Sequence, residues 1–391
     1  MAESTTVVQA DENLLHEYDA LATRSYGHRI EDITRLGPYA DIRVALREGR
    51  VVAGGLGLLM PQFFGGRPVP SACLGSGCVA PEERGEHLTV RMLNERIRPL
   101  QEQGAVLATL WTSSNGYARR MGWEAPTAVF SWSVDTDALK RSFDPGDIDI
   151  EHGLTPGIEN LQQELAQQFN GPLLRPDWWT PSQHKKHDLT CYRFSRPGRP
   201  PSGYLSLATR PREQHGAHLA IHDFWASDDS TAAAMLSFLG RHNSRVASVD
   251  FQRTSLPPHP IMLHGLHRYR AATAQAWHPW MLRILDLPEA VRLRGWPTDL
   301  DVTIPIGVGQ ENGDAYDRYL LHISSGAAEL HPTSIESQIR LTRRQAAVWY
   351  AGGYRSTAAA RMSGVQATSP HELAALIRST TEHESWLPDH F

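Results

Sequence analysis

The feature that most constrains the fold is a series of strand-length apolar runs separated by glycine turns in residues 41–79. Asp41 to Arg47 alternates apolar and charged residues, and Glu48-Gly49 is a turn signal before the largely apolar run Val51 to Met60. A second glycine turn leads into Val69 to Val79, which reads as a further strand. These spacings predict a β-hairpin extended by another strand.

An amphipathic helix is predicted directly after these strands, over Leu88 to Gln103. Its apolar residues share one side, and Arg96 is expected elsewhere on the helix. The apolar positions are Leu88, Met92, Leu93, Ile97 and Leu100. Gly104 ends the helix, and Ala105 to Trp111 is again an apolar run of strand length. The segment therefore predicts an α/β fold in which a helix packs on a sheet.

The length of 391 residues favours two or three domains, at roughly 150 residues per domain. We predict three, over 1–140, 147–285 and 286–391, with a turn-rich linker before Asp147. Phe130 to Val134 is expected to end the first domain. The second repeats the plan of the first weakly, but it has no candidate phosphate loop between strand and helix.

The predicted third domain mixes strands and helices. The strands are expected at Asp299 to Ile306, Arg318 to Ser324 and Ile335 to Leu341, and the helices at Arg343 to Tyr350 and Pro370 to Ser379.

Composition excludes several function classes. The 38 basic and 43 acidic residues give a net charge of −5 and form no basic run, so we expect no nucleic-acid partner. We also expect no signal peptide, and no membrane span because no apolar run approaches about 18 residues. The three cysteines show no metal-ligand spacing, so we predict buried thiols, no metal and a cytoplasmic location.

Three motifs carry a resemblance to a known family. Val79-Ala-Pro-Glu-Glu-Arg-Gly-Glu-His-Leu-Thr stands where GCN5-related acetyltransferases have a pyrophosphate loop between strand and helix. Phe63-Phe-Gly-Gly-Arg-Pro is similar to the glycine-rich hairpin before that loop in the Eis family of N-acetyltransferases. Ser113-Ser-Asn-Gly-Tyr-Ala-Arg-Arg-Met-Gly-Trp resembles the Ser-Glu-Gly-x-x-Tyr-x-x-Phe-Gly-Tyr motif of the same family.

The resemblance covers nearly the whole chain. It continues through Trp178-Trp179, Gly203-Tyr204, Trp280-Met-Leu-Arg-Ile-Leu-Asp-Leu-Pro and Val348-Trp-Tyr-Ala-Gly-Gly-Tyr to a final Phe391. It implies two tandem GNAT-like domains followed by a sterol-carrier-like domain. It also implies a homo-oligomer, either a trimer or a hexamer built from trimers, and acetyl-CoA or another acyl-CoA as cofactor.

The resemblance also implies a cofactor loop. Its residues are Val79, Arg84, Gly85, His87, Leu88 and Thr89. The loop departs from the family pattern, because His87 stands where the family has a glycine that lets the backbone approach phosphate. Glu82, Glu83 and Glu86 also outnumber Arg84 in a loop that would meet a highly anionic ligand. We therefore expect acetyl-CoA to bind weakly or not at all.

Four residues are candidates for catalysis. The family uses its terminal carboxylate as base, which implies Phe391, and the stiff apolar segment Trp386-Leu-Pro-Asp before it is unlike a frayed end. The family's acid tyrosine aligns with Ala118, one residue from Tyr117, and one residue turns a helix by about 100°. Ser113 falls at the end of the active-site strand.

His28 follows a segment whose counterpart lines the family's substrate cleft, and histidine titrates near neutral pH. Each candidate also has a plain interpretation: packing for Tyr117, capping of the next helix for Ser113, and the end of a surface helix for His28. For Phe391 it is that every chain ends in a carboxylate and most termini are mobile.

These observations favour an Eis-like acyl-CoA-dependent N-acyltransferase acting on an amine-bearing small molecule, such as an aminoglycoside or another natural product. One alternative is a diverged enzyme of secondary metabolism that keeps the fold but no longer uses acetyl-CoA, with His28 and His87 among its acid-base groups. The other is a non-catalytic protein that binds a small molecule on the same scaffold.

Overall fold

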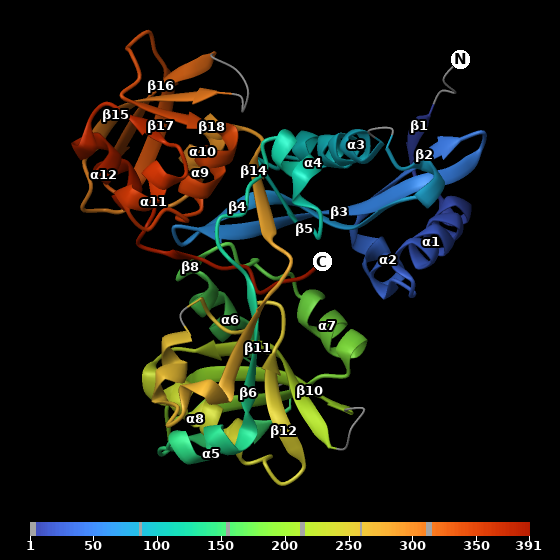
Figure 1. Ribbon diagram of the computed structural model, residues 1–391, viewed down its shortest axis with the longest axis vertical. Helices are drawn as coiled ribbons and strands as arrows, with labels where there is room; N and C mark the ends of the chain where they lie inside the picture. Colours follow the sequence, from blue (N-terminus) through green and yellow to red (C-terminus); the bar gives the residue numbers. More distant parts are fainter. Residues whose placement is uncertain (1–4, 86–87, 154–156, 212–215, 259, 310–314) are drawn as a thin grey trace. The chain divides into compact units, whose positions relative to one another are not determined.

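The computed structural model describes residues 5–85, 88–153, 157–211, 216–258, 260–309 and 315–391. The chain forms two compact units, drawn in Figure 1 with the colours following the sequence. The first unit contains Met1–Thr127, Pro279–His383 and His390–Phe391. The second contains Ala128–His278 and Glu384–Asp389.

The first unit holds a sheet with the order β1-β2-β3-β4-β5-β14, which we call the first sheet. β4 and β5 run parallel, and the other neighbouring strands are antiparallel. The strands are β1 (Thr6–Gln9), β2 (Asp41–Arg47), β3 (Arg50–Phe64), β4 (Arg67–Val79), β5 (Leu107–Trp111) and β14 (Trp280–Ile284). The predicted hairpin is thus present, with strands longer than the apolar runs alone indicated.

Helices cover both faces of the first sheet (Figure 1). They are α1 (Glu12–Tyr26), α2 (Glu31–Leu36), α3 (Leu88–Glu102) and α4 (Asn115–Arg120). Gly54 and Gly55 are neighbours on β3 and face opposite sides, as strand geometry requires. A Cβ on Gly54 would lie 2.4 Å from the Tyr18 ring of α1, and one on Gly55 would lie 2.4 Å from the Arg96 guanidinium of α3. Glycine at both positions therefore lets the two helices approach the sheet closely.

The first unit also holds a third sheet, with the order β17-β16-β15-β18-β19. Its strands are β15 (Val302–Gly309), β16 (Tyr316–Ser324), β17 (Ala327–Pro332), β18 (Ile339–Thr342) and β19 (Gln366–Ala367), and its helices are α9 (Leu287–Leu293), α10 (Arg343–Tyr350), α11 (Thr357–Met362) and α12 (Pro370–Arg378). A capping box between Thr342 and Gln345 starts α10, so its predicted bounds are met. The strand expected from Ile335 begins at Ile339.

A buried arginine, Arg294, follows α9 and contacts the end of α10. Arg294 is 1% exposed, lies over the rings of Trp296 and Tyr350, and donates to the carbonyls of Gly295 and Tyr350. Burial lowers the pKa of Arg294 to about 10. Backbone oxygens and ring faces satisfy this guanidinium without a carboxylate.

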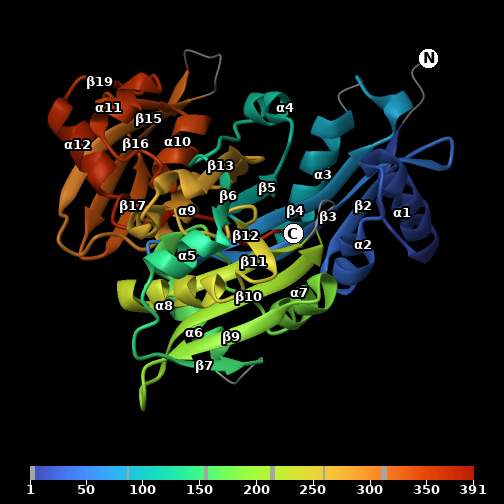
Figure 2. The ribbon, with the colours of Figure 1, turned by 60° about the horizontal axis from the view of Figure 1, so that its bottom comes forward.

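The second unit holds the second sheet, with the order β13-β6-β12-β11-β10-β9-β7 (Figure 2). Its strands are β6 (Phe130–Asp135), β7 (Asp149–His152), β9 (Thr190–Ser195), β10 (Pro201–Pro211), β11 (Ala217–Ala226), β12 (Val246–Phe251) and β13 (Ala272–Ala276), and its helices are α5 (Thr136–Ser142), α6 (Ile158–Ala166), α7 (Trp179–His187) and α8 (Asp229–Gly240). β11 and β12 are parallel, like β4 and β5. The second sheet therefore repeats the central plan of the first.

Two strands pair differently from the chain order. We expected Phe130 to Val134 to end the first domain, but β6 pairs with β12 and β13 in the second sheet. β14 pairs with β5 in the first sheet, although it follows the second unit in sequence. Each of these strands therefore joins a sheet other than the one that contains the strand before it in the chain. The domain boundaries drawn from the sequence, 1–140, 147–285 and 286–391, stay a prediction.

The chain's last residues pack as a defined segment in the second unit. β20 (Glu384–Ser385) pairs with β8 (Phe169–Asn170). The Trp386 ring lies 4.7 Å from that of Trp225, and its Nε1 donates to the Thr254 carbonyl at 2.7 Å. Thr254 Oγ1 in turn donates to the Leu387 carbonyl. This segment is anchored on both faces rather than frayed.

Candidate functional site

A gap opens in the first sheet where its two parallel strands part. β4 and β5 pair from Ser71 and Leu107 as far as Leu74 and Leu110. Beyond these residues, β5 continues beside β14 and β4 continues beside β3. We call this point the splay. Backbone groups of β4 beyond it face no partner on β5, which makes them available to a ligand.

A β-bulge lies immediately beyond the splay. Gly75 is opposite Leu56 and Cys78 is opposite Gly54, so Ser76 and Gly77 together oppose Gly55 and β4 has one extra residue in the ladder. Ser76 has φ of +50°, a left-handed conformation that is uncommon for residues other than glycine. The bulge interrupts the regular alternation of side chains between the two faces of the strand. Strained backbone of this kind is concentrated at functional sites.

Two tyrosines of α1 bind the carbonyls of the bulge. Tyr18 donates to the Ser76 carbonyl at 2.5 Å and Tyr26 donates to the Gly77 carbonyl at 2.6 Å. Burial raises the pKa of Tyr26 to about 12 and raises that of Tyr18 well above its usual value. Both hydroxyls therefore keep their protons and act as fixed donors. Neither tyrosine was among the predicted site residues.

An arginine of α3 binds the bulge from the opposite face. Arg96 Nη2 donates to the Gly75 carbonyl at 2.7 Å and also to the Leu56 carbonyl. Arg96 is 4% exposed, so the expectation that it lies off the buried side of the helix is wrong. A pattern analysis treats arginine as polar, whereas here two backbone oxygens satisfy the buried fork. Within the described residues no Asp or Glu pairs with it, and burial lowers its pKa.

The end of the chain lies at the same place in the first unit. A Cβ on Gly75 would be 2.6 Å from the carboxyl carbon of Phe391, so only glycine permits this approach. The His390 ring stacks on Trp111, the last residue of β5, with 4.3 Å between ring centroids. Gly75 and Trp111 follow the last paired residues of their strands. The two terminal residues are thus at the splay.

Tyr117, another predicted catalytic residue, is partly buried near the end of β5. Tyr117 packs partly buried against the core, and its hydroxyl is 3.3 Å from Thr112 Oγ1, one residue beyond β5. It is also near enough to Tyr26 and Arg96 to affect their pKa values. Ala118 is fully buried. The hydroxyl of Tyr117, despite the one-residue offset, therefore lies near the strand end.

Ser113 and His28 are exposed. Ser113 lies between β5 and α4, and Ser114 rather than Ser113 is the N-cap of α4, so the capping interpretation does not apply to Ser113. His28 follows Gly27, the left-handed C-cap of α1, and its Nδ1 is 3.2 Å from the Tyr26 carbonyl. The hydroxyl of that same Tyr26 holds the bulge.

The predicted cofactor loop connects β4 to α3. Val79 is the last residue of β4, Leu88 is the buried first residue of α3, and Thr89 is half-buried on it. Gly85 has φ of +101°, and a Cβ there would meet nothing within 4 Å. His87, with Glu86, lies outside the described residues.

Arginines from other elements offset the acidic charge of this loop. Glu82 pairs with Arg24 of α1 at 3.0 Å, and Glu83 pairs with Arg47 of β2. The loop's own Arg84 is exposed. The charge imbalance read from the sequence is therefore reduced, and an open glycine before a helix N-terminus suits the phosphates of acyl-CoA.

The corresponding turn of the second sheet is built differently. Only Ser227 and Asp228 separate β11 from α8, and the Asp228 carboxylate accepts from the Thr231 amide at 2.8 Å. Burial would raise the pKa of Asp228, but hydrogen bonds from Thr231 and Ser230 outweigh it and hold that pKa at about 2. The N-terminus of α8 is thus capped by the chain's own anion, in agreement with the absence of a predicted phosphate loop.

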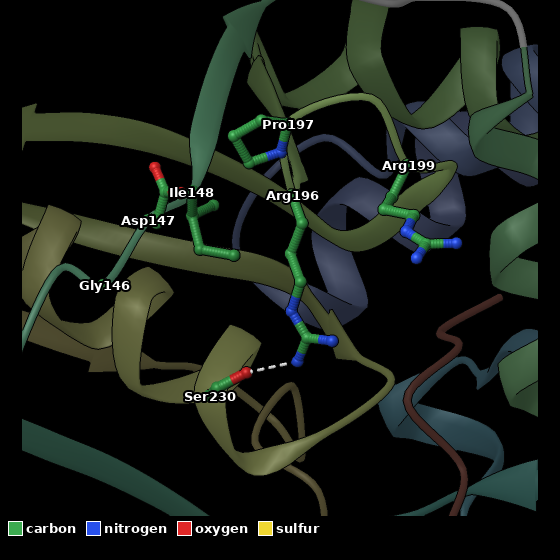
Figure 3. A pocket seen from close by; sticks show the side chains of 7 residues that line it. All are labelled: Gly146, Asp147, Ile148, Arg196, Pro197, Arg199 and Ser230. Atoms are coloured by element: carbon green, nitrogen blue, oxygen red, sulfur yellow. Dashed lines mark hydrogen bonds between the residues drawn. The ribbon is translucent and has the colours of Figure 1, made fainter.

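A hollow of about 420 Å³ lies beside this cap in the second unit (Figure 3). It is lined by Gly146, Asp147, Ile148, Arg196, Pro197, Arg199 and Ser230. Arg196 extends across it to donate to Ser230 Oγ at 2.7 Å, and it also pairs with Asp228. No predicted site residue lines this hollow.

Cys73, Cys78 and Cys191 are buried free thiols, as predicted. Among the described residues, no three His, Cys, Asp or Glu side chains form a group that could hold a metal ion. No helix in the described ranges is both long and apolar enough to cross a bilayer.

Comparison with known proteins identifies the domains. Residues 10–125 and residues 171–284 each match an acetyltransferase (GNAT) domain, and residues 287–388 match a sterol carrier protein domain. The chain thus carries two GNAT domains. The tandem GNAT domains followed by a sterol-carrier domain confirm the Eis-type composition and the α/β fold predicted from the sequence.

Relatives of similar length support a transferase-type enzyme. An uncharacterized N-acetyltransferase of Streptomyces avermitilis is 25% identical over 354 residues, which cover 84% of this chain and 82% of that protein. Two crystal structures share the fold. The GCN5-related N-acetyltransferase from Anabaena variabilis has a TM-score of 0.86 at 20% identity, covering 99% of this chain and 100% of its own. Eis1 from Mycobacterium abscessus has a TM-score of 0.77 at 18% identity, with the same coverage.

Proposed function

We propose that this GNAT protein is an acyl-CoA-dependent N-acyltransferase for an amine-bearing small molecule, with the Phe391 carboxylate as its base. The observation that carries the proposal is the contact of that carboxyl group with Gly75 at the splay, where unpaired backbone of β4 is available. Stacking of His390 on Trp111 supports it, because a stacked neighbour restricts the motion of the terminal residue.

The chain's groups fit the proton transfers of this reaction. The amine forms a bond to the acyl carbon as the carbon–sulfur bond breaks, and the amine gives up one proton while the departing sulfur gains one. A carboxylate within reach of the amine accepts the first proton. Tyr117 is the proposed source of the second, because its hydroxyl lies near the end of β5. Tyr26 is unsuited to this step, since its proton is held by the Gly77 carbonyl.

Acyl-CoA would supply the activated acyl group. Val79, Arg84, Gly85, Leu88 and Thr89, with His87, are the residues proposed to hold it. The open Gly85 and the paired Glu82 and Glu83 support this assignment over the expectation of weak binding drawn from the sequence.

Calorimetry with acetyl-CoA tests the cofactor. A dissociation constant in the micromolar range supports the proposal, and His87→Gly should tighten binding if the histidine obstructs the backbone. Absence of binding at millimolar ligand would overturn the acyl-CoA reaction and leave the diverged enzyme or the binding protein.

Moving the terminal carboxylate tests the base. Deleting Phe391, or adding one glycine after it, should lower kcat by about a hundredfold or more. Phe391→Leu is the matched control, because it changes the side chain and keeps the carboxylate in place. Equal activity of the extended protein would exclude the terminal carboxylate as base.

The substrate class and the setting complete the proposal. We propose an aminoglycoside or another amine-bearing natural product as acceptor, a cytoplasmic location in keeping with three free thiols, and a trimer or a hexamer of trimers. A clean monomer by light scattering at micromolar concentration would exclude the assembly.

A further inference from the structure

The bulge exposes one backbone amide whose orientation depends on Arg96. The trans peptide between Gly75 and Ser76 holds its carbonyl and its N–H on opposite sides. Arg96 binds the carbonyl from the α3 face, so the Ser76 N–H is directed away from the guanidinium. A Cβ on the neighbouring Gly75 would meet the Phe391 carboxyl group rather than Arg96.

The guanidinium is held in a socket made by glycines. A Cβ on Gly55 would be 2.4 to 2.6 Å from three of its atoms, and a Cβ on Gly77 would be 2.9 Å from Nη1. Gly75 and Gly77 would share a face in a regular strand, but across the bulge one faces Phe391 and the other faces Arg96. The glycines thus leave room for the Arg96 guanidinium, and the guanidinium in turn holds the backbone of the bulge in place.

Burying this charge is costly for a purely structural role. No Asp or Glu within the described residues pairs with Arg96, and its Nε has no hydrogen-bond partner. A buried cation of this kind is strongly disfavoured unless an anion balances it. The charge lies directly behind the peptide whose N–H faces the splay, where an acyl oxygen would gain negative charge during transfer.

We propose that Arg96 is a positioning residue for acyl transfer. Resting on the proposed function, it fixes the Gly75–Ser76 peptide so that the Ser76 N–H donates to the acyl carbonyl oxygen. Its positive charge strengthens that donor by polarising the peptide. Arg96 itself does not touch the acyl group.

A pair of unreactive ligands isolates this contact from activity. S-(2-oxopropyl)-CoA has a ketone carbonyl one methylene away from the sulfur, and S-propyl-CoA lacks it, so the ratio of their dissociation constants measures the carbonyl contact. In the unmodified protein we expect the carbonyl to tighten binding about tenfold. In Arg96→Met the ratio should fall to about one, while S-propyl-CoA binds nearly as before. Arg96→Lys should lie between, since it keeps the charge but loses the planar fork.

Arg294→Lys is the matched control, because it alters another buried arginine held by backbone carbonyls without touching the bulge. Its stability should fall and its ratio should not change. If Arg96→Met does not fold, Arg96→Lys and Gly77→Ala, which displaces Nη1, provide the measurement. A tenfold ratio in any folded Arg96 variant overturns the proposal. Failure of both ligands to bind the unmodified protein overturns the acyl-CoA reaction, and the role of Arg96 falls with it.

Discussion

The first and second sheets each have a buried arginine beside a bulged strand, and the two arginines have different partners. Arg96 binds two backbone carbonyls next to the bulge of β4. Arg175 pairs with Asp223 at 2.6 Å and Asp389 at 2.8 Å, beside the bulge that His222 makes in β11. Burial disfavours the charge of Arg175, but the two carboxylates outweigh it and raise its pKa.

This difference in partners agrees with a structural role for Arg175 and with the positioning role proposed for Arg96. Two carboxylates neutralise the charge of Arg175. Asp223 also accepts hydrogen bonds from Ser206 and Trp225, so its carboxylate has partners within the second unit. Arg96, by contrast, pairs with no Asp or Glu among the described residues. Sites that break a local rule of stability without compensation are expected at functional positions.

The gaps beyond the parallel strands differ in the same way. In the second sheet, β11 and β12 pair as far as Ile221 and Phe251. Beyond that point, Trp386 packs on Trp225 and donates to Thr254. The gap that could admit a ligand is thus filled by the chain itself. Two related sheets in one chain have therefore specialised, one for a site and one for anchoring the tail.

Removing the neutralised arginine should produce the largest effect. Arg175→Met leaves Asp223 and Asp389 buried without a cation, which should lower the free energy of unfolding by about 3–5 kcal/mol. Urea denaturation measures it. Arg193→Met, which breaks only the outer pair with Glu151, should cost less than about 1 kcal/mol. Equal losses in the two variants would remove the distinction drawn for Arg175.

Removing the ring that fills the second gap should rank next. Trp386→Ala deletes a buried side chain packed on Trp225 and Phe169 and should cost about 3 kcal/mol by the same measurement. Trp386→Phe keeps much of the ring and loses the bond to Thr254, so about 1 kcal/mol is expected. A loss below 1 kcal/mol in the alanine variant would show that the tail contributes little.

The two bulges should also differ in their response to acid. Burial lowers the pKa of His222 to about 4, and nearby Arg253, Arg210 and Lys186 lower it while Asp223 opposes them. The unfolded chain takes up this proton near pH 6.5. His222 thus contributes fully above pH 6.5, and its contribution is lost as pH falls towards 4.

Between pH 7 and 4.5, His222→Gln should therefore lose about 2 kcal/mol less than the unmodified protein. Chemical denaturation at both pH values measures this difference. Parallel pH curves for the two proteins would show that His222 is not shielded from protonation.

The smallest effect is expected at the capped helix. Asp228→Ala removes the cap of α8 and should cost about 1 kcal/mol. Asp229→Ala, one residue later and not a cap, should cost less than about 0.5 kcal/mol. Thermal denaturation of both variants compares them, and a larger loss for Asp229→Ala would contradict the assignment of the cap.

Local signals accounted for much of the fold. The predicted bounds of α10, Arg343 to Tyr350, match the structure, in which a capping box starts the helix. The exchange of β6 and β14 did not follow, because alternation shows that a strand exists but not which edge it joins. The same limit applies to the site. The bonds from Tyr18 and Tyr26 to the bulge were not predicted, because their hydroxyl acceptors are 58 and 51 positions away in the chain.

The sequence by itself determined the α/β class, the Eis-type order of domains, the buried thiols and the motif positions, since each depends on residue type and short spacing. The tertiary structure decided which charged groups of the site are paired and which are buried. Glu82 and Glu83 looked repulsive until Arg24 and Arg47 met them, and Arg96 looked exposed until backbone oxygens enclosed it. Electrostatic energy depends on distance and burial, and both arise only when segments far apart in the chain come together.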